Sequence, residues 1–493
     1  MAKEVNFIDT TFRDGQQSLW AEGMTTGMML PVAELMDRAG FTSMELIASS
    51  HFLKCVRELR EDPWERIRLL SKRITRTPLV LMTHYSIAAF DLTPFSILKV
   101  YFERLKANGI KRVQLMDPAN DLSFRVHHCV KFAKEVGLEV ALGLVFSISP
   151  KHTDEHYAQK VRDAAGLKVD TIYLKDSGGL LTPERARTLI PLFLQNSNGI
   201  PVALHSHCTT GLAPMVYLDA VKLGVNTVCT AIPPLANGPS QPSIFNIAGN
   251  LRYLGYVPKI DEEALKPVSA HFEAIARREK LPIGKPLEYD AYQYVHQVPG
   301  GVISNLKHQL TKLRMEGRLE EVLAEAIQVR KDLGYPIMVT PFSQYVVSQA
   351  SINVMLGERY KQVLDEIIQY TLGHWGKESS DAVDSDIKER ILNYPRAKEL
   401  SLGEPAQPAI EEVRRQLGGT GVSDEELLLR YIVREQSELE AMRAAGPVKE
   451  YRDTVRPLVS LLQELLKQDS LDQISIQREG LAVSLRREDG SGT

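Results

Sequence analysis

Two patterns of hydrophobic and polar residues alternate from residue 4 to about residue 232. Amphipathic stretches with apolar residues at the helical spacing are followed, within a few residues, by short apolar runs. The amphipathic stretches end near a glycine, which suits the left-handed conformation that closes a helix. The apolar runs predict strands at Val5–Ile8, Met44–Ile47, Leu79–Met82, Arg112–Met116, Val140–Leu142, Thr171–Leu174, Val202–Leu204 and Thr227–Cys229.

This alternation predicts an α/β fold with a parallel sheet. About eight strand–helix units in about 230 residues fit a (β/α)8 TIM barrel better than an open doubly wound sheet. A G-x-G-x-x-G sequence does not follow the first strand, which argues against dinucleotide binding. In such a barrel the carboxyl ends of the strands meet at one mouth, where active sites lie.

The pattern changes after about residue 245. Residues 260–380 have a mostly helical period, and breakers at Pro395, Gly403, Pro405 and Pro408 predict a linker over 376–410. A charged helix is expected from Asp424 to about Ala445, followed by a helix and a β-hairpin between about 452 and 487. We therefore divide the chain into a barrel (1–250), a helical annex (251–380), a linker with charged helices (381–450) and a small C-terminal segment (451–493).

The composition is that of an ordinary soluble globular protein. Of 493 residues, 44% are hydrophobic and 25% charged, with a net charge of -3, which does not favour nucleic-acid binding. Apolar runs of the roughly 20 residues needed to span a bilayer are absent from the sequence. The N-terminus enters a strand almost at once, so we expect no signal peptide and a cytoplasmic location. The 4 cysteines lack zinc-site spacing and are expected to be reduced.

The most informative motif is His205-Ser206-His207 at the end of an apolar strand. Side chains two apart on a strand point to the same face, so both imidazoles aim at one place, as two ligands of one metal ion must. Asp14, after the first strand, would bring a carboxylate to the same mouth. This donor set suits zinc, manganese, iron or cobalt without choosing among them. Cys208 is expected to point away.

Each of these residues also has a structural interpretation. The histidines could be a satisfied core pair, Asp14 could cap the following helix, and Lys175 and Asp176 could form an ion pair. A lysine at the end of a barrel strand is costly to bury as a cation. Lys175 could therefore pair with an aspartate, could have a lowered pKa for Schiff-base chemistry, or could become a carbamate.

Several segments together resemble the carboxyltransferase component of biotin-dependent enzymes, such as pyruvate carboxylase, the oxaloacetate decarboxylase alpha subunit and the transcarboxylase that uses methylmalonyl-CoA. The resemblance covers about residues 4–375. It rests on the segments 7–18 (FIDTTFRDGQQS), 61–66 (EDPWER), 175–183 (KDSGGLLTP), 205–211 (HSHCTTG), 297–301 (QVPGG) and 332–336 (DLGYP).

The resemblance implies a metal-dependent enzyme that moves a carboxyl group between carboxybiotin and an enolisable keto acid of the pyruvate or oxaloacetate type. Asp14, Lys175 as its carbamate, His205 and His207 fall on the family's metal positions, where zinc, manganese or cobalt is expected. Arg13 and Gln17 fall on residues that contact the acceptor and its enolate. Arg13, Gln17 and Lys175 are accordingly the expected catalytic residues.

The chain departs from the family pattern at two substrate-binding positions. Thr83 aligns with the family's keto-acid arginine, and Pro239 aligns with its proton-shuttling threonine. The Ala-His of the first motif is Gly15-Gln16 here. A threonine cannot replace an arginine's paired contact with a carboxylate, and proline has no hydroxyl to relay a proton. The acceptor could therefore differ from pyruvate and oxaloacetate.

The chain contains no Ala-Met-Lys-Met sequence. We therefore expect carboxybiotin to come on a separate carrier protein, with a separate biotin carboxylase, and we expect a homodimer by resemblance. Two alternatives stay open. One is a metal-dependent aldolase or lyase of the related barrel superfamily, and the other is a non-catalytic metal-binding scaffold of a biotin carboxylase assembly.

Overall fold

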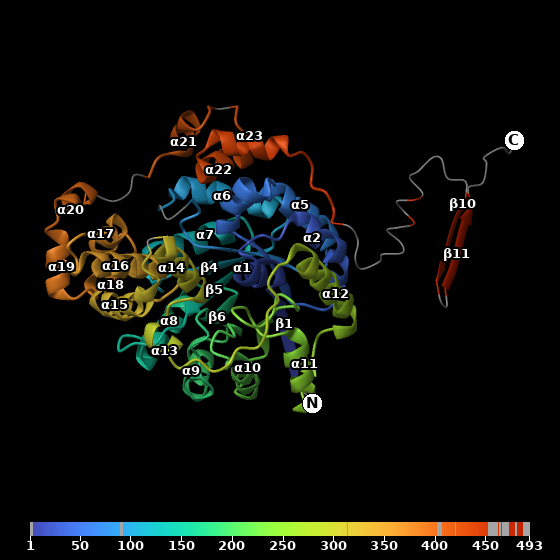
Figure 1. Cartoon of the computed structure of the whole chain (residues 1–493), viewed down its shortest axis with the longest axis horizontal. Coiled ribbons are helices and arrows are strands. Elements are labelled where there is room, and N and C mark those ends of the chain that lie inside the picture. The colour runs from blue at the N-terminus through green and yellow to red at the C-terminus, as the bar shows by residue number, and fades with distance from the viewer. Residues whose placement is uncertain are drawn as a thin grey trace.

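The computed structural model describes residues 3–88, 92–312, 314–401, 407–419, 421–451, 462, 465, 473–478 and 481–486. A closed parallel barrel lies at its centre, surrounded by helices, and further helices lie at one end and along one side (Figure 1). The predicted TIM barrel is therefore confirmed.

The barrel strands follow one another around the ring in sequence order, and β1 closes the ring by pairing with both β8 and β2. A short strand β9 (Val257–Pro258) adds to the outer part of β1. Each predicted apolar run lies in one strand: β1 (Glu4–Asp9), β2 (Ser43–Ala48), β3 (Leu79–Thr83), β4 (Arg112–Met116), β5 (Glu139–Val145), β6 (Thr171–Asp176), β7 (Val202–Ser206) and β8 (Thr227–Thr230).

Some of the helices around the barrel begin at recognisable capping residues. Asp62 accepts a hydrogen bond from Trp64 N, with Pro63 at the first helical position, and Thr182 accepts one from Arg185 N. The outer helices are α3 (Ala33–Arg38), α5 (Pro63–Arg73), α6 (Phe95–Ala107), α7 (His127–Glu135), α8 (Asp154–Gly166), α9 (Pro183–Asn196), α10 (Ala213–Lys222) and α11 (Ile244–Tyr253). Short helices α1 (Gln16–Trp20), α2 (Thr26–Met29) and α4 (Ser49–Lys54), π-helical turns at 11–15, 55–59 and 122–126 and a 3-10 turn at 30–32 lie between them.

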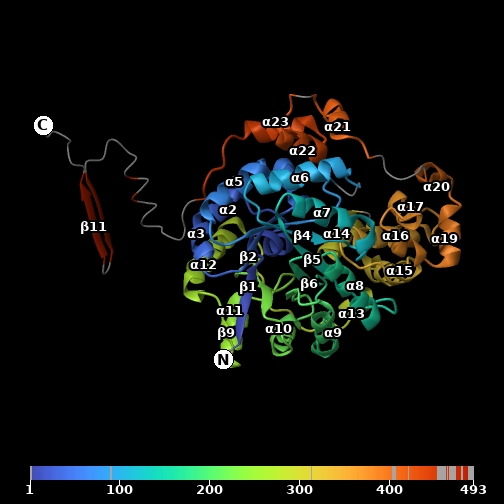
Figure 2. The same cartoon turned by 180° about the vertical axis from the view of Figure 1, so that it is seen from behind.

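Beyond the barrel, most helices of the annex lie near α8 at one end of the molecule, whereas the first of them packs against α3 (Figures 1 and 2). Its helices are α12 (Glu262–Glu279), α13 (Gln293–His296), α14 (Gly300–Lys312), α15 (Leu319–Asp332), α16 (Phe342–Leu356) and α17 (Asp365–Leu372), with a 3-10 turn at 316–318. The expected linker over 376–410 is instead helical in α18 (Lys377–Asp381), α19 (Ser385–Leu392) and α20 (Pro395–Leu400). Pro395 begins α20, a position where its missing N–H costs nothing, so it does not break the helix.

The chain then returns to the barrel. Helices α21 (Ile410–Gln416), α22 (Asp424–Val433) and α23 (Gln436–Ala444) lie along α5 and α6 (Figure 2). The single charged helix expected over 424–445 is two helices, because Arg434 has a φ of 65°. A contact between Arg68 Nη1 and Glu425 Oε2, 2.7 Å apart, links the barrel to α22.

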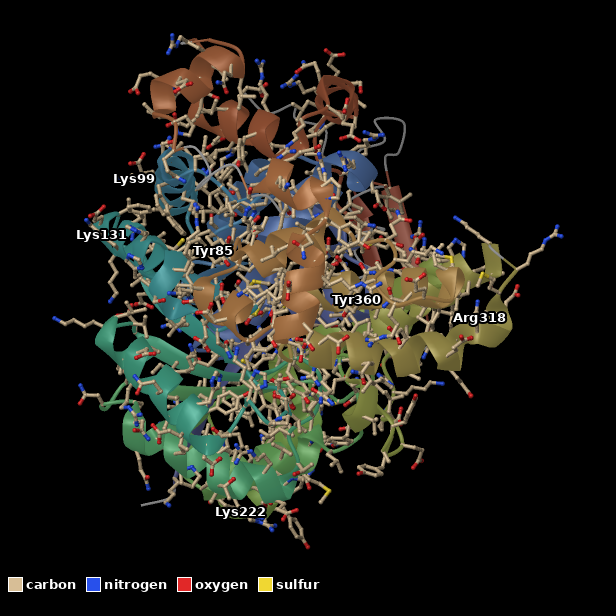
Figure 3. All side chains as sticks on the ribbon, turned by 90° about the vertical axis from the view of Figure 1, so that its left-hand side faces the viewer. Tyr85, Lys99, Lys131, Lys222, Arg318 and Tyr360 are labelled. Carbon is tan, nitrogen blue, oxygen red and sulfur yellow. The ribbon has the colours of Figure 1, made fainter. Side chains whose placement is uncertain are left out.

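The predicted C-terminal hairpin is confirmed as β10 (Gln473–Arg478) paired antiparallel with β11 (Leu481–Arg486), with Ile474 opposite Leu485. The helix expected before it, the turn and the chain end fall outside the described residues, apart from residues 462 and 465. None of the helices within the described ranges is long and apolar enough to cross a membrane. Figure 3 shows Lys131, Lys222 and Arg318 at the periphery.

Candidate metal and acceptor site

Arg13 and Asp14 lie on the π-helical turn that directly follows β1. The turn is fixed at both ends, because Thr11 Oγ1 donates to Asp9 Oδ1 at 2.6 Å and Gly15 N donates to Thr10 O at 2.9 Å. A Cβ atom at Gly15 would lie 2.9 Å from Leu235 O, which is closer than real Cβ atoms come. Glycine at this position therefore lets the turn pack against the loop after β8.

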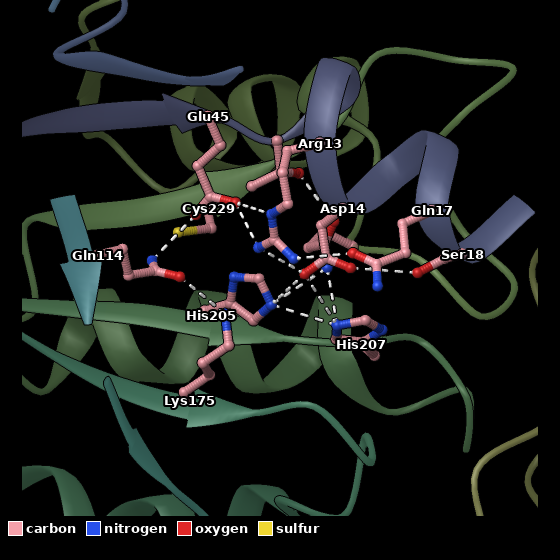
Figure 4. A network of polar contacts seen from close by, with 12 residues as sticks. Arg13, Asp14, Gln17, Ser18, Glu45, Gln114, Lys175, His205, His207 and Cys229 are labelled. Atoms are coloured by element: carbon pink, nitrogen blue, oxygen red, sulfur yellow. Dashed lines mark hydrogen bonds and ion pairs between the residues drawn. The ribbon is translucent and has the colours of Figure 1, made fainter. Parts of the chain in front are cut away.

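Asp14 meets the two predicted histidines at the barrel mouth (Figure 4). His205 Nε2 lies 3.0 Å and His207 Nε2 3.4 Å from Asp14 Oδ2, and the two Nε2 atoms are 3.2 Å apart. All three residues are buried. The structure thus brings together Asp14, His205 and His207, which come from opposite ends of the barrel sequence.

The loop after β8 orients both rings. His207 Nδ1 lies 2.6 Å from the carbonyl oxygen of Pro239, which accepts its N–H, so Nε2 is the ring nitrogen that faces Asp14. Gln241 Nε2 lies 3.2 Å from His205 Nε2 and 2.9 Å from His207 Nε2. The Gln241 carbonyl in turn accepts a 2.8 Å hydrogen bond from Thr10 Oγ1, which fixes its amide against β1.

The chemistry of these three donors fits a divalent cation. Burial, and then the neighbouring Lys175, hold the pKa of His205 well below its ordinary value, so its ring is neutral. Burial raises the pKa of Asp14, but Arg13 and His207 together lower it by more. The pKa therefore lies well below its ordinary value, and the carboxylate is charged. His205 Nδ1 is buried without a hydrogen-bond partner. The two imidazole rings and the carboxylate offer donor atoms that lie within 4.8 Å of one another, so one ion could bind all three.

A second buried group, of Glu45, His205 and Cys229, has the same spacing. Its donor atoms are less available to a metal ion than those of the Asp14 group. Glu45 Oε2 accepts a 2.7 Å hydrogen bond from Arg13 Nε and its Oε1 one of 3.0 Å from Gln114 Nε2. Burial raises the pKa of the Cys229 thiol well above its ordinary value, so it remains protonated. The Asp14 group is therefore the better metal site.

A line of buried polar groups extends from Asp14 across the barrel interior. The Arg13 guanidinium lies 2.9 Å from Asp14 Oδ2 and also contacts Glu45, and Gln114 joins Glu45 to Lys175. Lys175 Nζ donates to Gln114 Oε1 at 3.1 Å. Burial, and then the positive charge of Arg13, lower the pKa of Lys175, which favours the neutral amine. Among the described residues Lys175 forms no ion pair.

Gln17 links His51 to Arg13. Gln17 Oε1 is 3.5 Å from Arg13 Nη1 and 3.3 Å from His51 Nε2, and His51 Nδ1 is 3.4 Å from Gln16 Nε2. Burial, and then Arg13, hold the pKa of His51 well below its ordinary value. Arg13 and Gln17 are thus neighbours.

The two positions that depart from the family pattern lie differently. Pro239 joins the site through its carbonyl, on His207. Thr83 does not join the site. Its Oγ1 donates a hydrogen bond to His84 O at 2.9 Å. Burial raises the pKa of Tyr101 on α6, and the Thr83 hydroxyl, which contacts this tyrosine, partly offsets that rise. Strand alternation explains this, since the neighbouring Met82, paired in register with Gln114, takes the inner face.

Asp176 is also directed away from Lys175. Its carboxylate accepts hydrogen bonds from Ser206 Oγ at 2.7 Å and from Leu180 N at 2.8 Å. It therefore anchors the loop after β6 to β7 instead of forming an ion pair with Lys175. Cys208 Sγ lies outside both groups of candidate donors, as expected.

Sequence reasoning missed five residues of this network. Three of them had a signal, because Glu45 and Gln114 are polar residues inside apolar strand runs, and Gln241 lies in the same loop as Pro239. Cys229 ends a predicted strand without any distinguishing feature. His51 belongs to a short helix after β2, and only the tertiary structure brings it to Gln17.

Comparisons with known proteins agree with this geometry. A family model described as HMGL-like matches residues 4–270, and one described as conserved carboxylase domain matches residues 294–457. A pyruvate carboxylase subunit of Methanocaldococcus jannaschii is 37% identical over 91% of this chain and 80% of its own length. The 2-oxoglutarate carboxylase large subunit of Hydrogenobacter thermophilus is 30% identical, over 89% of this chain and 70% of its own length.

Among solved structures, the carboxyl transferase domain from Rhizobium etli pyruvate carboxylase with pyruvate superimposes with a TM-score of 0.79. The match covers 93% of this chain and 79% of that chain at 23% sequence identity. At that identity the likeness shows a common fold, which here includes the annex as well as the barrel.

Proposed function

Because the chain belongs to the carboxyltransferase subunits of biotin-dependent enzymes, we propose that it moves a carboxyl group between carboxybiotin and an enolisable 2-oxo acid. The observation that carries this proposal is the buried group of Asp14, His205 and His207 with the Arg13 guanidinium beside it. In the proposed complex, that arrangement would put fixed positive charge beside the oxygen of the acceptor enolate.

Asp14, His205 and His207 would hold the divalent ion, with zinc, manganese or cobalt as the proposed metal. When bound, the ion would supply Lewis-acid polarisation of the acceptor carbonyl. Arg13 would donate hydrogen bonds to the acceptor from the side opposite Glu45, and Gln17 would bind the acceptor at the edge of the mouth. Glu45 holds the Arg13 guanidinium in one orientation, so no reorganisation is needed when charge develops.

We propose that Lys175 carries a carbamate. The neutral amine that its lowered pKa favours can attack CO2, forming one N–C bond and releasing one proton. The resulting anion would become a further oxygen donor beside the histidines, because Lys175 is paired in register with His205 on the neighbouring strand. The acceptor side of the site is also dry, since Arg13 and Lys175 are each 2% exposed and His205 is fully buried. Excluding water protects CO2 and an enolate from competing reactions.

Carboxybiotin would arrive on a separate carrier polypeptide, with a biotin carboxylase as a further partner. The two relatives are each named as one subunit of a carboxylase, which supports an assembly of several chains. We also propose a homodimer within that assembly. Co-purification of a biotinylated polypeptide with the chain tests the carrier, and isolation without one contradicts it.

Decarboxylation of oxaloacetate by the purified, metal-loaded chain, with and without free biotin, tests the function. We expect biotin to stimulate the reaction, and Asp14→Asn to lower the rate by about two to three orders of magnitude. Asp219→Asn, on α10, is the matched control and keeps its rate. Cleavage that does not depend on biotin would favour the lyase alternative, and a bound metal without turnover on any 2-oxo acid would favour the scaffold.

A further inference from the structure

His51 is a buried imidazole that has no task in the function proposed above. It lies on α4, is 1% exposed, and contacts Gln16 through Nδ1 and Gln17 through Nε2. Because its pKa is held well below the ordinary value, the ring is neutral and carries one proton. The ring nitrogen that carries this proton decides which end of each neighbouring amide the histidine can bind.

A backbone group sets the direction of these hydrogen bonds. Met24 N, which can only donate, lies 3.2 Å from Gln16 Oε1. This contact fixes the Gln16 amide, so that its Nε2 donates to His51 Nδ1 at 3.4 Å. Since Nδ1 accepts a hydrogen bond, the single proton of the neutral ring is on Nε2.

The proton on His51 Nε2 orients Gln17 in turn. His51 Nε2 donates to Gln17 Oε1 at 3.3 Å, and Arg13 Nη1 donates to the same oxygen at 3.5 Å. Glu22 Oε1 lies 3.6 Å from His51 Nε2 and, as an acceptor, favours a proton on the same nitrogen. Turning the Gln17 amide around would bring its NH2 group against two N–H donors and break both hydrogen bonds.

The amide nitrogen of Gln17 is left as a free donor. Within the described part of the chain, Gln17 Nε2 has no hydrogen-bond partner, and the residue is half-buried, whereas Arg13 and His51 are almost fully buried. Gln17 lies beside Arg13 and Asp14 (Figure 4). This part of the candidate site therefore presents an N–H group and not a carbonyl oxygen.

We propose that His51 is a positioning residue that fixes Gln17 as a hydrogen-bond donor to the acceptor. This inference rests on the proposed function, in which Gln17 binds the acceptor. The oxygen atoms of an ionised 2-oxo acid and of its enolate only accept hydrogen bonds, so a Gln17 carbonyl turned toward them would repel them. Since the Thr83 hydroxyl donates to His84 O, Arg13 and Gln17 are the side chains proposed to donate to the acceptor.

Steady-state kinetics of biotin-stimulated oxaloacetate decarboxylation by the metal-loaded chain tests the role of His51. His51→Leu should lower kcat/KM about 10-fold, because Gln17 can then turn, and the loss should fall on KM for oxaloacetate and not on KM for biotin. His51→Gln can accept from Gln16 and donate to Gln17, so kcat/KM should stay within about threefold of the unaltered chain. His271→Leu changes a buried histidine of α12 outside the site and, as the matched control, should keep its kcat/KM.

A double-mutant cycle separates positioning from a general structural effect. Gln17→Ala alone should lower kcat/KM by about 10–100-fold, since it removes a hydrogen bond to a charged acceptor. If His51 acts through Gln17, adding His51→Leu to Gln17→Ala should lower kcat/KM by no more than about twofold further. A further loss of about 10-fold would overturn the inference, because His51 would then act independently of Gln17.

Neutron diffraction from crystals of the deuterium-exchanged, unaltered chain tests the inference without any variant, and so does not depend on whether the variants fold. We expect deuterium on His51 Nε2 and none on Nδ1, with the ND2 group of Gln17 turned away from Arg13. Deuterium on His51 Nδ1 alone, or a Gln17 carbonyl turned away from Arg13, would overturn the inference.

The outcomes distinguish the two proposals. Biotin-stimulated decarboxylation that His51→Leu leaves unchanged would overturn the role of His51 and leave the carboxyltransferase function intact. Absence of biotin-stimulated decarboxylation in the unaltered chain would overturn both.

Discussion

Single residues around Asp14 have separable tasks. Gln241 contacts both histidines and is held by Thr10, so it fixes the spacing of the two Nε2 atoms without itself being a proposed ligand. Groups that orient ligands in this way are typically worth about 10–100-fold in metal affinity.

We therefore predict that Gln241→Leu weakens metal binding by about 10–100-fold, measured by competition with a chelator. Gln159→Leu, exposed on α8, should leave the affinity unchanged. Equal affinity of both variants and the unaltered chain would show that Gln241 does not position the rings.

Asp117, at the end of β4, is a buried carboxyl outside the candidate site. Burial raises its pKa from an ordinary 3.8 to about 7, although Oδ1 accepts hydrogen bonds of 2.8 Å each from Ala119 N and Asp121 N. Since the folded pKa is the higher one, the folded chain retains a proton that the unfolded chain releases. Stability from this group is therefore present at low pH and lost as the pH rises from about 4 to 7.

Asp117→Asn should consequently raise the free energy of unfolding at pH 8 by about 1–3 kcal/mol, with a gain that shrinks toward pH 4. Denaturant titrations at several pH values measure it, with the exposed Asp381→Asn as control. A gain that does not depend on pH would contradict the raised pKa.

At the scale of elements, strands and their order were predictable because apolar runs and glycine-closed helices alternate regularly. Thr83 shows where this reasoning stops. An alignment cannot say which of two adjacent residues on β3 faces inward, whereas the register with β4 assigns the inner face to Met82. Similarly, prolines between 376 and 410 predicted a linker, but Pro395 begins a helix.

The π-helical turn after β1 gives an element-scale prediction. Gly15→Ala would push a Cβ to within 2.9 Å of Leu235 O, so we expect a loss of about 1–3 kcal/mol in stability and weaker metal binding, because Arg13 and Asp14 must shift with the turn. Gly249→Ala, on exposed α11 with nothing within 4 Å, should stabilise the chain by about 0.5–1 kcal/mol. Thermal unfolding of both variants shows whether each change stabilises or destabilises the chain. Stabilisation by Gly15→Ala would contradict the close approach of Gly15 to Leu235 O.

For the whole molecule, the segment 407–451 is the least expected part, because nothing local in its sequence shows that it packs back onto the barrel. Leu428 of α22 is fully buried, whereas the ion pair of Arg57 with Glu438 is partly exposed. The site itself shows the same limit. The group of Asp14, His205 and His207 was predictable from two motifs, but the place of His51 depends on long-range packing.

Leu428→Ala should lower the free energy of unfolding by about 2–5 kcal/mol, and Glu438→Gln by less than about 1 kcal/mol. Urea unfolding followed by fluorescence and by far-ultraviolet circular dichroism would show one coincident transition if the segment and the barrel unfold together. Two separated transitions, with only one shifted by Leu428→Ala, would contradict a shared core.

The most direct test of the proposed metal site is diffraction from crystals grown with manganese or cobalt, with anomalous differences collected at the metal edge. We expect one strong anomalous peak within bonding distance of Asp14 Oδ2, His205 Nε2 and His207 Nε2, with additional density on Lys175 Nζ. A peak between Glu45 and Cys229, or none at the barrel mouth, would show that these three residues do not hold the metal.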